Sequence, residues 1–257
     1  MKITFIGTSS GKTSLDRFHS SLLFSSKKYN LLVDAGDGIS RALLSGGINF
    51  NSLNGILFTH LHPDHFSGLP ALIVQMKMMN RKKRLDIFIN ETLKTIAEEF
   101  LVKSYLLPDK QGFEICYNTF KDNEQINITK GFAFIARKNS HLSGLQKFRS
   151  KYSSLSLYSA SVLFETGDKI IIYTSDIGSE EDLLLFSEFV PDILISEATH
   201  ILLAAIVKKL IKINPDKVYL THYSDDDIPS IVEIMASLPT NLKKIVKLAQ
   251  DGLSFEI

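Results

Sequence analysis

The sequence predicts an α/β (α+β) fold in which two β-sheets are packed face to face, with helices on their outer sides. Two observations predict it. Short apolar runs typical of buried strands alternate with segments of helical periodicity, in two similar halves of the 257 residues. Charged or imidazole side chains follow one predicted strand after another. We expect these strand ends to lie along one edge of the sandwich and to form the functional site there.

The composition favours a single domain over residues 1–257, because no linker or low-complexity segment interrupts the chain. With 29 Lys and Arg against 28 Asp and Glu, the net charge of +1 provides no global field that would attract nucleic acid or an anionic membrane. The single cysteine, Cys116, excludes an internal disulfide and a thiolate-rich metal site. Neither a signal sequence nor a membrane span is evident. We therefore expect a cytoplasmic protein, for which a homodimer is a possible assembly.

The first predicted elements are a strand over residues 1–7, a hairpin over 20–24 and 29–34, and a short helix over 39–44. The segment from Gly7 to Thr13 imitates a phosphate-binding loop. Only three residues separate Gly7 from Gly11, where that motif has four. We interpret the segment as a glycine-rich turn that lets the backbone approach the active site.

Three histidines and a carboxylate are clustered directly after a predicted buried strand at residues 55–58. His60 and His62 lie at i and i+2 of an extended segment, so both side chains point the same way and can bind one ion together. Pro63 sets a turn, after which Asp64 and His65 lie at the start of a new helix. Imidazole and carboxylate groups are metal ligands. Four of them on one turn predict two metal ions rather than one.

Asp34 ends the second strand of the first hairpin and is followed by Ala35-Gly36-Asp37-Gly38. Its carboxylate could cap the turn formed by these glycines. It could also accept the N–H of a metal-bound histidine and so fix the tautomer of that ring. Given the histidine cluster, we favour the second role.

The remaining elements continue the alternation of strands and helices. The basic run at residues 81–84 is interpreted as a solvated loop rather than an RNA contact. The acids at residues 180–182 are interpreted as a capped helix start without a catalytic role. Helices are predicted near residues 69–79, 93–101, 201–211 and 229–238, and strands at 85–89, within 113–137, and at 156–165, 169–174, 193–195, 217–220, 244–248 and 253–257.

Further candidate ligands and acids follow the strands of the second half. These residues are His141, Asp176, Glu197, His200 and His222. A lone histidine after a strand is ordinarily structural, but the cluster at residues 60–65 leaves ligand positions to be filled. His200 is open to two interpretations, as a proton donor or as a histidine on the surface of a helix.

The pattern His60-x-His62-x-Asp64-His65 resembles that of the metallo-β-lactamase superfamily, whose fold is a four-layer αβ/βα sandwich. The resemblance extends along nearly all of the chain and is greatest to the ribonuclease Z and related phosphodiesterase branch. The segments that carry it are 7–11, 34–38, 173–176, 197–199 and 221–224.

The resemblance implies a role for each candidate ligand. One metal ion is expected to be bound by His60, His62 and His141, and a second by Asp64, His65 and His222. Asp176 is expected to bridge the two ions. Asp34 falls where the superfamily has its strand-ending aspartate.

Three departures from ribonuclease Z concern the substrate. Ribonuclease Z has a histidine directly before Glu-Ala-Thr, where this chain has Ser196. The interval from His141 to Asp176 is 35 residues (176 − 141), too short for the long arm with which many ribonuclease Z enzymes bind tRNA. Three acids at residues 225–227 replace the Arg-Tyr of ribonuclease Z and would repel a phosphate backbone. These departures argue against tRNA and leave metal-dependent hydrolysis intact.

The sequence therefore predicts a dinuclear metal-dependent hydrolase, a phosphodiesterase acting on a small phosphodiester or a nucleic-acid 3′ end. Asp64 is expected to act as ligand and proton acceptor, and Glu197 with His200 to protonate the leaving group. His19 is a third candidate donor, for which a structural role is favoured. Zinc is the expected metal, with manganese or iron as options because no soft ligand selects between them. The alternatives are a thioester, lactone or lactam hydrolase and a metal-binding protein without turnover.

Overall fold

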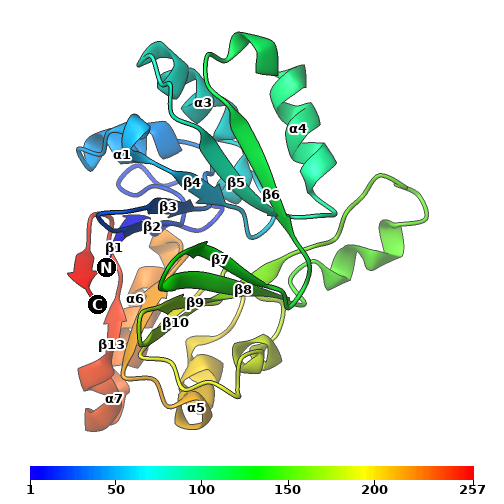
Figure 1. Cartoon of the computed structure of the whole chain (residues 1–257). Helices are drawn as coiled ribbons and strands as arrows, with labels where there is room; N and C mark the ends of the chain where they lie inside the picture. Colours follow the sequence, from blue (N-terminus) through cyan, green and yellow to red (C-terminus); the bar gives the residue numbers. More distant parts are fainter. The chain divides into compact units, whose positions relative to one another are not determined.

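A computed structural model describes residues 1–257 and divides the chain into two compact units. The first unit comprises residues 1–121 and 250–257, and the second comprises residues 122–249. Each unit contains one seven-stranded mixed sheet with its own helices (Figure 1). That the whole chain forms a single domain stays a prediction.

In the first unit, the parallel strands end at the edge of the sheet where the first histidine cluster begins. Strands β3 to β6 are parallel, whereas β14, β1, β2 and β3 are antiparallel neighbours. Parallel strands have their carboxyl ends at a common edge, so the residues after β3 and β4 lie side by side. In sheet order, the strands are β14 (Ser254–Glu256), β1 (Lys2–Gly7), β2 (Ser21–Ser25), β3 (Asn30–Val33), β4 (Gly55–Leu57), β5 (Leu85–Asn90) and β6 (Ile115–Phe120).

Helices α1, α3 and α4 cover one face of this sheet (Figure 1). The helix predicted near residues 69–79 is confirmed as α3, on which Leu69, Leu72, Ile73 and Met76 are buried. Met79, the last residue of the predicted range, lies just beyond the helix end and is 44% exposed. The helices of the unit are α1 (Ile39–Ser45), η1 (Phe50–Ser52), α2 (Pro63–Phe66), α3 (Leu69–Met78), α4 (Lys94–Lys103) and η2 (Pro108–Lys110).

The sheet of the second unit also brings several strand ends to one edge. Strands β10 to β13 are parallel, and β8 and β10 are both antiparallel to β9, so β8 and β10 run in the same direction. The carboxyl ends of β8, β10, β11 and β12 therefore share an edge. In sheet order, the strands are β13 (Val246–Leu248), β12 (Lys217–Thr221), β11 (Ile193–Glu197), β10 (Lys169–Tyr173), β9 (Ala160–Thr166), β8 (Phe132–Lys138) and β7 (Gln125–Thr129).

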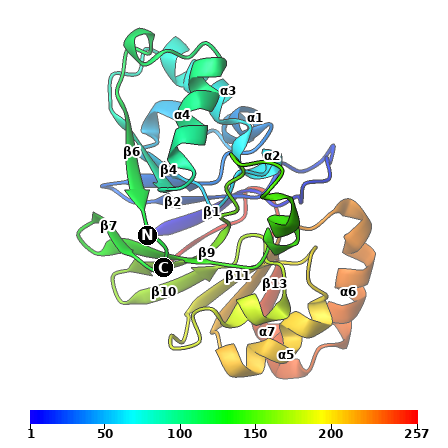
Figure 2. The ribbon, with the colours of Figure 1, turned by 90° about the vertical axis from the view of Figure 1, so that its right-hand side faces the viewer.

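Helices α5, α6 and α7 line one face of this second sheet (Figure 2). They bury Ile206, Leu210, Ile231 and Leu242 against the strands in one apolar cluster. Burying such side chains is worth roughly 1.5–3 kcal/mol each. The helices of the unit are η3 (Ser143–Phe148), η4 (Glu180–Leu184), α5 (Leu203–Ile213), η5 (Asp225–Asp227), α6 (Ile228–Ser237) and α7 (Thr240–Ile245).

The solvated loop predicted at residues 81–84 is confirmed for Lys82, Lys83 and Arg84, which are exposed, and is wrong for Arg81. Arg81 is only 2% exposed, so it does not belong to a solvated loop. Its guanidinium donates hydrogen bonds to the carbonyl oxygens of Leu53, Lys83 and Arg84, at 2.9, 2.7 and 2.7 Å. The planar fork of donors in arginine suits such a set of acceptors. Arg81 thus holds the α3–β5 connection together.

No helix of the structure combines the length and the apolar character required to cross a membrane.

Candidate metal centre

The first unit gathers four predicted ligands around the short helix α2. His60 follows β4, His62 precedes the helix with extended backbone, and Pro63 occupies its first position. The His60 ring lies 4.8 Å from that of His62 and 4.2 Å from that of His65, measured between ring centroids. The Nε2 atom of His65 lies 3.4 Å from Oδ2 of Asp64. The four side chains thus lie together on this turn, and that they bind metal stays a prediction.

Asp34 supports this group, as the sequence indicated. It follows β3 in a left-handed backbone conformation, with φ of 61°, and is completely buried. Its carboxylate accepts hydrogen bonds from the Thr59 main-chain N–H at 2.9 Å and from Nδ1 of His65 at 2.8 Å. Burial raises the pKa of the Asp34 carboxyl, and His65 and Thr59 act in the opposite direction. With Nδ1 bound to Asp34, His65 presents Nε2 as its ligand atom.

We expect an Asp34→Asn substitution to lower metal affinity by roughly 10- to 100-fold, as is typical when the partner of a ligating histidine is lost. An amide can still accept from Thr59, but it no longer provides the charge that favours Nδ1–H of His65. Titration against a competing chelator measures the effect. Asp37→Asn, at an exposed acid of the same loop, is the matched control. Equal affinities in the two variants would contradict the role of Asp34.

Gly36 allows the loop after β3 to lie directly against α2. A Cβ atom at Gly36 would come within 1.8 Å of the Asp64 carbonyl oxygen, so no other residue fits there. Main-chain bonds join the two segments, from Ala35 N to His65 O at 2.6 Å and from Gly68 N to Ala35 O at 2.9 Å. The loop therefore fixes the backbone of Asp64 and His65.

The glycine-rich segment after β1 is a turn, and no helix follows it, so it lacks the architecture of a nucleotide-binding loop. Gly11 lies against the Asp64 side chain, where a Cβ would be 3.1 Å from Oδ2. Nδ1 of His19 lies 2.7 Å from the carbonyl oxygen of Ser10, which is the structural contact favoured for this histidine.

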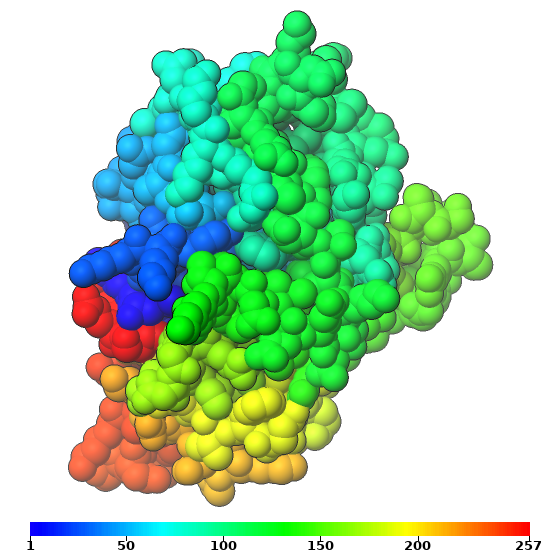
Figure 3. Space-filling view, in the orientation of Figure 1, coloured from blue at the N-terminus to red at the C-terminus, as the bar shows by residue number.

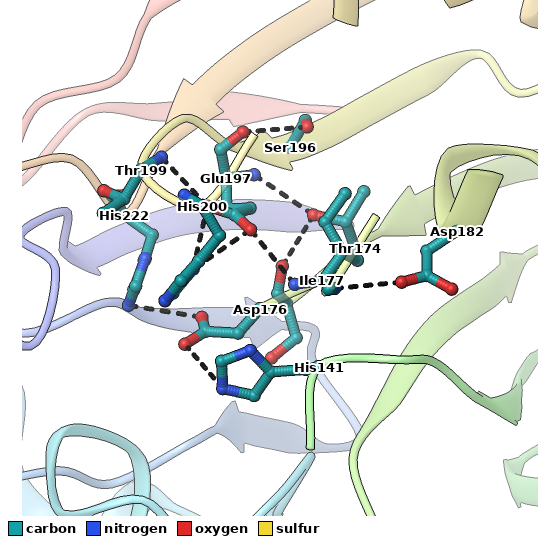
Figure 4. Close-up of polar contacts among 12 residues, drawn as sticks. His141, Thr174, Asp176, Ile177, Asp182, Ser196, Glu197, Thr199, His200 and His222 are labelled. Atoms are coloured by element: carbon teal, nitrogen blue, oxygen red, sulfur yellow. Dashed lines mark hydrogen bonds and ion pairs between the residues drawn. The ribbon is translucent and has the colours of Figure 1, made fainter. Parts of the chain in front are cut away.

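In the second unit, Asp176 lies between two histidines (Figure 4). Its Oδ1 lies 3.2 Å from Nε2 of His222, and its Oδ2 lies 3.6 Å from Nε2 of His141. His222 follows β12, Asp176 follows β10 and His141 follows β8, and the carboxyl ends of these three strands share an edge of the sheet. One carboxylate with an oxygen facing each of two imidazoles is the arrangement expected of a ligand that bridges two ions.

Asn139 and Asp182 hold the loops that carry these ligands, and the sequence did not reveal their roles. The Asn139 side-chain amide donates to the carbonyl oxygen of Asp176 at 2.8 Å. The Asp182 carboxylate accepts from the Ser140 hydroxyl at 2.6 Å and from the main-chain N–H of Gly178 at 2.9 Å. The prediction that Asp182 only caps a helix start was incomplete. It also fixes Ser140, which precedes His141, and Gly178, which lies two residues after Asp176.

Glu197 and His200 form a pair at the end of β11 (Figure 4). The completely buried Glu197 carboxylate accepts from the main-chain N–H of Ile177 at 3.1 Å and of His200 at 2.8 Å. Nδ1 of His200 lies 3.1 Å from Glu197 Oε1. The His200 ring lies 4.8 Å from the ring of His141 and 5.5 Å from that of His222. Helix α5 begins only at Leu203, so His200 precedes the helix, and its ring lies beside those of two candidate ligands, His141 and His222.

At two of the positions where this chain departs from ribonuclease Z, the residue present has a local structural role. Ser196 is completely buried within β11, and its hydroxyl donates to the carbonyl oxygen of Glu197 at 3.0 Å. Because Ser196 carries no imidazole, the imidazole that contacts Glu197 in this chain is that of His200. Asp227 caps η5 by accepting from the Ser224 hydroxyl at 2.7 Å, so one of the three acids has a structural role.

The side chains of both units suit divalent metal ions. All seven predicted ligands offer nitrogen or oxygen donors, which zinc, manganese and iron accept. Within the first unit, the Nδ1 atoms of His60 and His65 contact Thr59 and Asp34, so Nε2 is the atom with which each ring would bind an ion. Glu197, His200 and His222 form a further group, whose potential ligand atoms lie within 4.8 Å of one another. There the Glu197 oxygens are already engaged by main-chain donors, so we interpret the group as positioning His200.

Several known proteins are similar to this chain. A family model described as anti-Pycsar protein Apyc1 matches residues 1–237. The anti-Pycsar protein Apyc1 of Bacillus phage vB_BsuM-Goe3 is 26% identical over 192 residues, which are 71% of this chain and 70% of that protein. A ribonuclease Z of Archaeoglobus fulgidus is 32% identical over 143 residues, which are 55% of this chain and 44% of that protein. The chain thus matches less than half of the length of this ribonuclease Z relative.

The fold also agrees with a solved structure. The metallo-β-lactamase fold protein YhfI of Bacillus subtilis has a TM-score of 0.76 at 21% identity, covering 99% of this chain and 98% of that chain. The predicted fold class is confirmed by this match, and the predicted resemblance to the ribonuclease Z branch is confirmed by the sequence relatives.

Proposed function

The chain belongs to the family of anti-Pycsar protein Apyc1, and on that premise we propose that it is a dinuclear metal-dependent phosphodiesterase acting on a small phosphodiester. The observation that carries the proposal is the placement of Asp176, with one carboxylate oxygen facing His222 and the other facing His141. A carboxylate shared in this way is typical of two-metal hydrolytic sites.

The proposal gives each ligand the role that the sequence indicated. One ion would be bound by His60, His62 and His141, and the other by Asp64, His65 and His222, with Asp176 shared. The nitrogen and oxygen donors make zinc the first choice, with manganese or iron as the alternatives to be tested. When bound, the two ions would supply Lewis-acid polarisation of the substrate and an attacking water of lowered pKa. Asp64 would accept the proton of that water, and His200, oriented by Glu197, would protonate the leaving oxygen.

Three features favour a small phosphodiester over a long RNA. The segment between β8 and β9 spans only residues 139–159 and contains the short helix η3, so it is shorter than the arm expected of a tRNA-binding ribonuclease Z. The acids at residues 225–227 would disfavour a phosphate backbone nearby. The net charge of +1 gives no field to attract one. A nucleic-acid 3′ end remains the second candidate, because relatives of the chain are named ribonuclease Z.

One panel tests this function. The purified protein is analysed for bound metal and assayed on bis(p-nitrophenyl) phosphate, 3′,5′-cyclic nucleotides, precursor tRNA, a thioester and a lactone. We expect turnover of at least one small phosphodiester, its loss with a chelator, and its recovery with zinc or manganese. Hydrolysis of the thioester or lactone without any phosphodiester would overturn the proposal. Cleavage of precursor tRNA alone would support the nucleic-acid end instead, and a metal-loaded protein without any turnover would support a binding protein.

A further inference from the structure

The sheet of the first unit has no strand on the outer side of β6. Strand β6 pairs with β5 and ends the order of strands, and it lies at the outer margin of its sheet in Figure 2. In Figure 3, which keeps the orientation of Figure 1, the green atoms of this part of the chain lie at the surface that faces the viewer. Such an edge presents main-chain N–H and C=O groups that another strand can pair with.

The pairing with β5 determines which groups of β6 face outward. Leu85 of β5 donates its main-chain N–H to the carbonyl oxygen of Glu114 at 2.9 Å, so Glu114 and every second residue after it face β5. The main-chain groups of Ile115, Tyr117 and Thr119 therefore face away from β5, because these groups alternate in direction along a strand. No strand of the chain pairs with them on that side.

The other three sheet edges have features that discourage pairing, and β6 has none of them. Strands β13 and β14 have only three residues each, and the pairing of β7 with β8 contains a register shift between Asn127 and Thr129. Strand β6 has six residues, with no charged residue, no proline and no register shift. Proteins protect free edges with short strands, bulges, charges or prolines. An edge without these features indicates a strand that pairs with another molecule.

Exposed apolar side chains lie beside this edge. Val102, near the end of α4, lines one cavity together with Ile115 and Tyr117 of β6. Val102 is 45% exposed, and Tyr105 and Leu107, which follow it, are 92% and 47% exposed. Removing such apolar surface from water favours association. These side chains therefore favour a protein partner at the edge, because another protein would cover them as well as the strand.

The sequence of β6 suits pairing with a second copy of itself. In an antiparallel pair, residues whose main-chain groups face the shared edge lie opposite one another. With Tyr117 opposite Tyr117 of the second copy, Ile115 lies opposite Thr119, and no charged side chain lies opposite another within the strand. Glu114 precedes β6 and Lys121 follows it. Each end of the pair therefore brings a carboxylate close to an ammonium group, which favours this orientation.

We propose that β6 pairs antiparallel with β6 of a second copy of this chain, so that the first-unit sheets of the two copies continue into one another across a two-fold axis. Facing residues then exchange both N–H···O bonds, as in any antiparallel ladder. The contact uses the same surface of both copies, which is the usual form of a closed dimer. It gives the homodimer expected from the sequence a definite interface, and it does not depend on the proposed metal chemistry.

Sedimentation equilibrium of the full-length, metal-loaded protein over micromolar concentrations tests this interface. We expect a reversible dimer, whose dissociation constant Thr119→Pro raises by at least about tenfold. The Thr119 N–H faces the open edge, so proline there removes a donor to the second copy and no bond within the sheet. Thr119→Val keeps that donor, is the matched control, and should dimerise like the wild type. Circular dichroism establishes that both variants are folded.

Reversal of the end charges tests whether the partner is a second copy in antiparallel orientation. At low salt, Glu114→Lys should weaken the dimer by about threefold or more, because it places like charges at both ends. Adding Lys121→Glu should restore the wild-type dissociation constant, and both positions are exposed. Failure of the second reversal to restore the dimer, or a dimer that Thr119→Pro leaves unchanged, would overturn the inference. So would a protein that stays monomeric at all concentrations, which would leave the edge to a strand of another protein.

Discussion

Replacing Asp176 with alanine is expected to remove the bound metal and to reduce phosphodiesterase activity to the background of the metal-free protein. Asp176 is 1% exposed, and its two oxygens face His222 and His141 at 3.2 and 3.6 Å. The substitution would leave the two proposed ions without their common oxygen donor. Two-metal chemistry lowers the activation free energy by several kcal/mol, so loss of the metals should reduce the rate by about 10³-fold or more. His62→Ala should give the same result from the first unit.

Metal content by elemental analysis and turnover of the small phosphodiester are measured together. Asp168→Ala is the matched control, because this exposed acid lies in the turn between β9 and β10, away from the strand ends. Circular dichroism establishes that both variants are folded. A folded Asp176→Ala protein that keeps its turnover would rule out the two-metal mechanism.

The candidate ligands could be located from the sequence because their positions follow from local rules, and that they bind metal stays a prediction. A residue after a parallel strand lies at the carboxyl edge of its sheet whatever the rest of the chain does. Asp34, His60, Asp176 and His222 all follow strands of this kind. The spacing of His60 and His62 likewise fixes their relative direction within one extended segment.

Roles that depend on residues distant in sequence could not be predicted in this way. Asp182 shows the pattern of a helix cap, and it does cap η4, but its bond to Ser140 spans 42 positions. Arg81 belongs to a run of basic residues that normally indicates a solvated loop, and only the fold shows that carbonyl groups surround it.

His200 is intermediate between residues that local rules place and residues whose roles depend on distant parts of the sequence. The sequence allowed two interpretations of His200, on a helix surface or at the site. Which of them holds depends on whether the helix that follows begins before or after His200. The structure begins α5 at Leu203 and places the His200 ring beside those of His141 and His222. A proton donor at this position should make the rate depend on the leaving group of the substrate, whereas a residue that only shapes the site should not.

Replacing His200 with glutamine is expected to reduce hydrolysis by about 10²- to 10⁴-fold for a phosphodiester with an alkoxide leaving group, while leaving the metal content unchanged. The reason is that a poor leaving group must be protonated as the bond breaks, and His200, whose Nδ1 lies 3.1 Å from Glu197 Oε1, is the group proposed to supply that proton. Glu197→Gln should lower the rate in the same direction, since it removes the charge that stabilises a protonated imidazole.

The leaving group separates this role from a structural one. The p-nitrophenolate of bis(p-nitrophenyl) phosphate leaves without protonation, so its hydrolysis by His200→Gln should stay close to the wild-type rate. His19→Gln is the matched control, because its ring contacts the Ser10 carbonyl oxygen and it should affect both substrates alike. If His200→Gln slows both substrates equally, the residue only shapes the site. If it slows neither, the proton comes from another group, and Asp64 becomes the candidate, because it is the one carboxylate proposed both to bind metal and to exchange a proton.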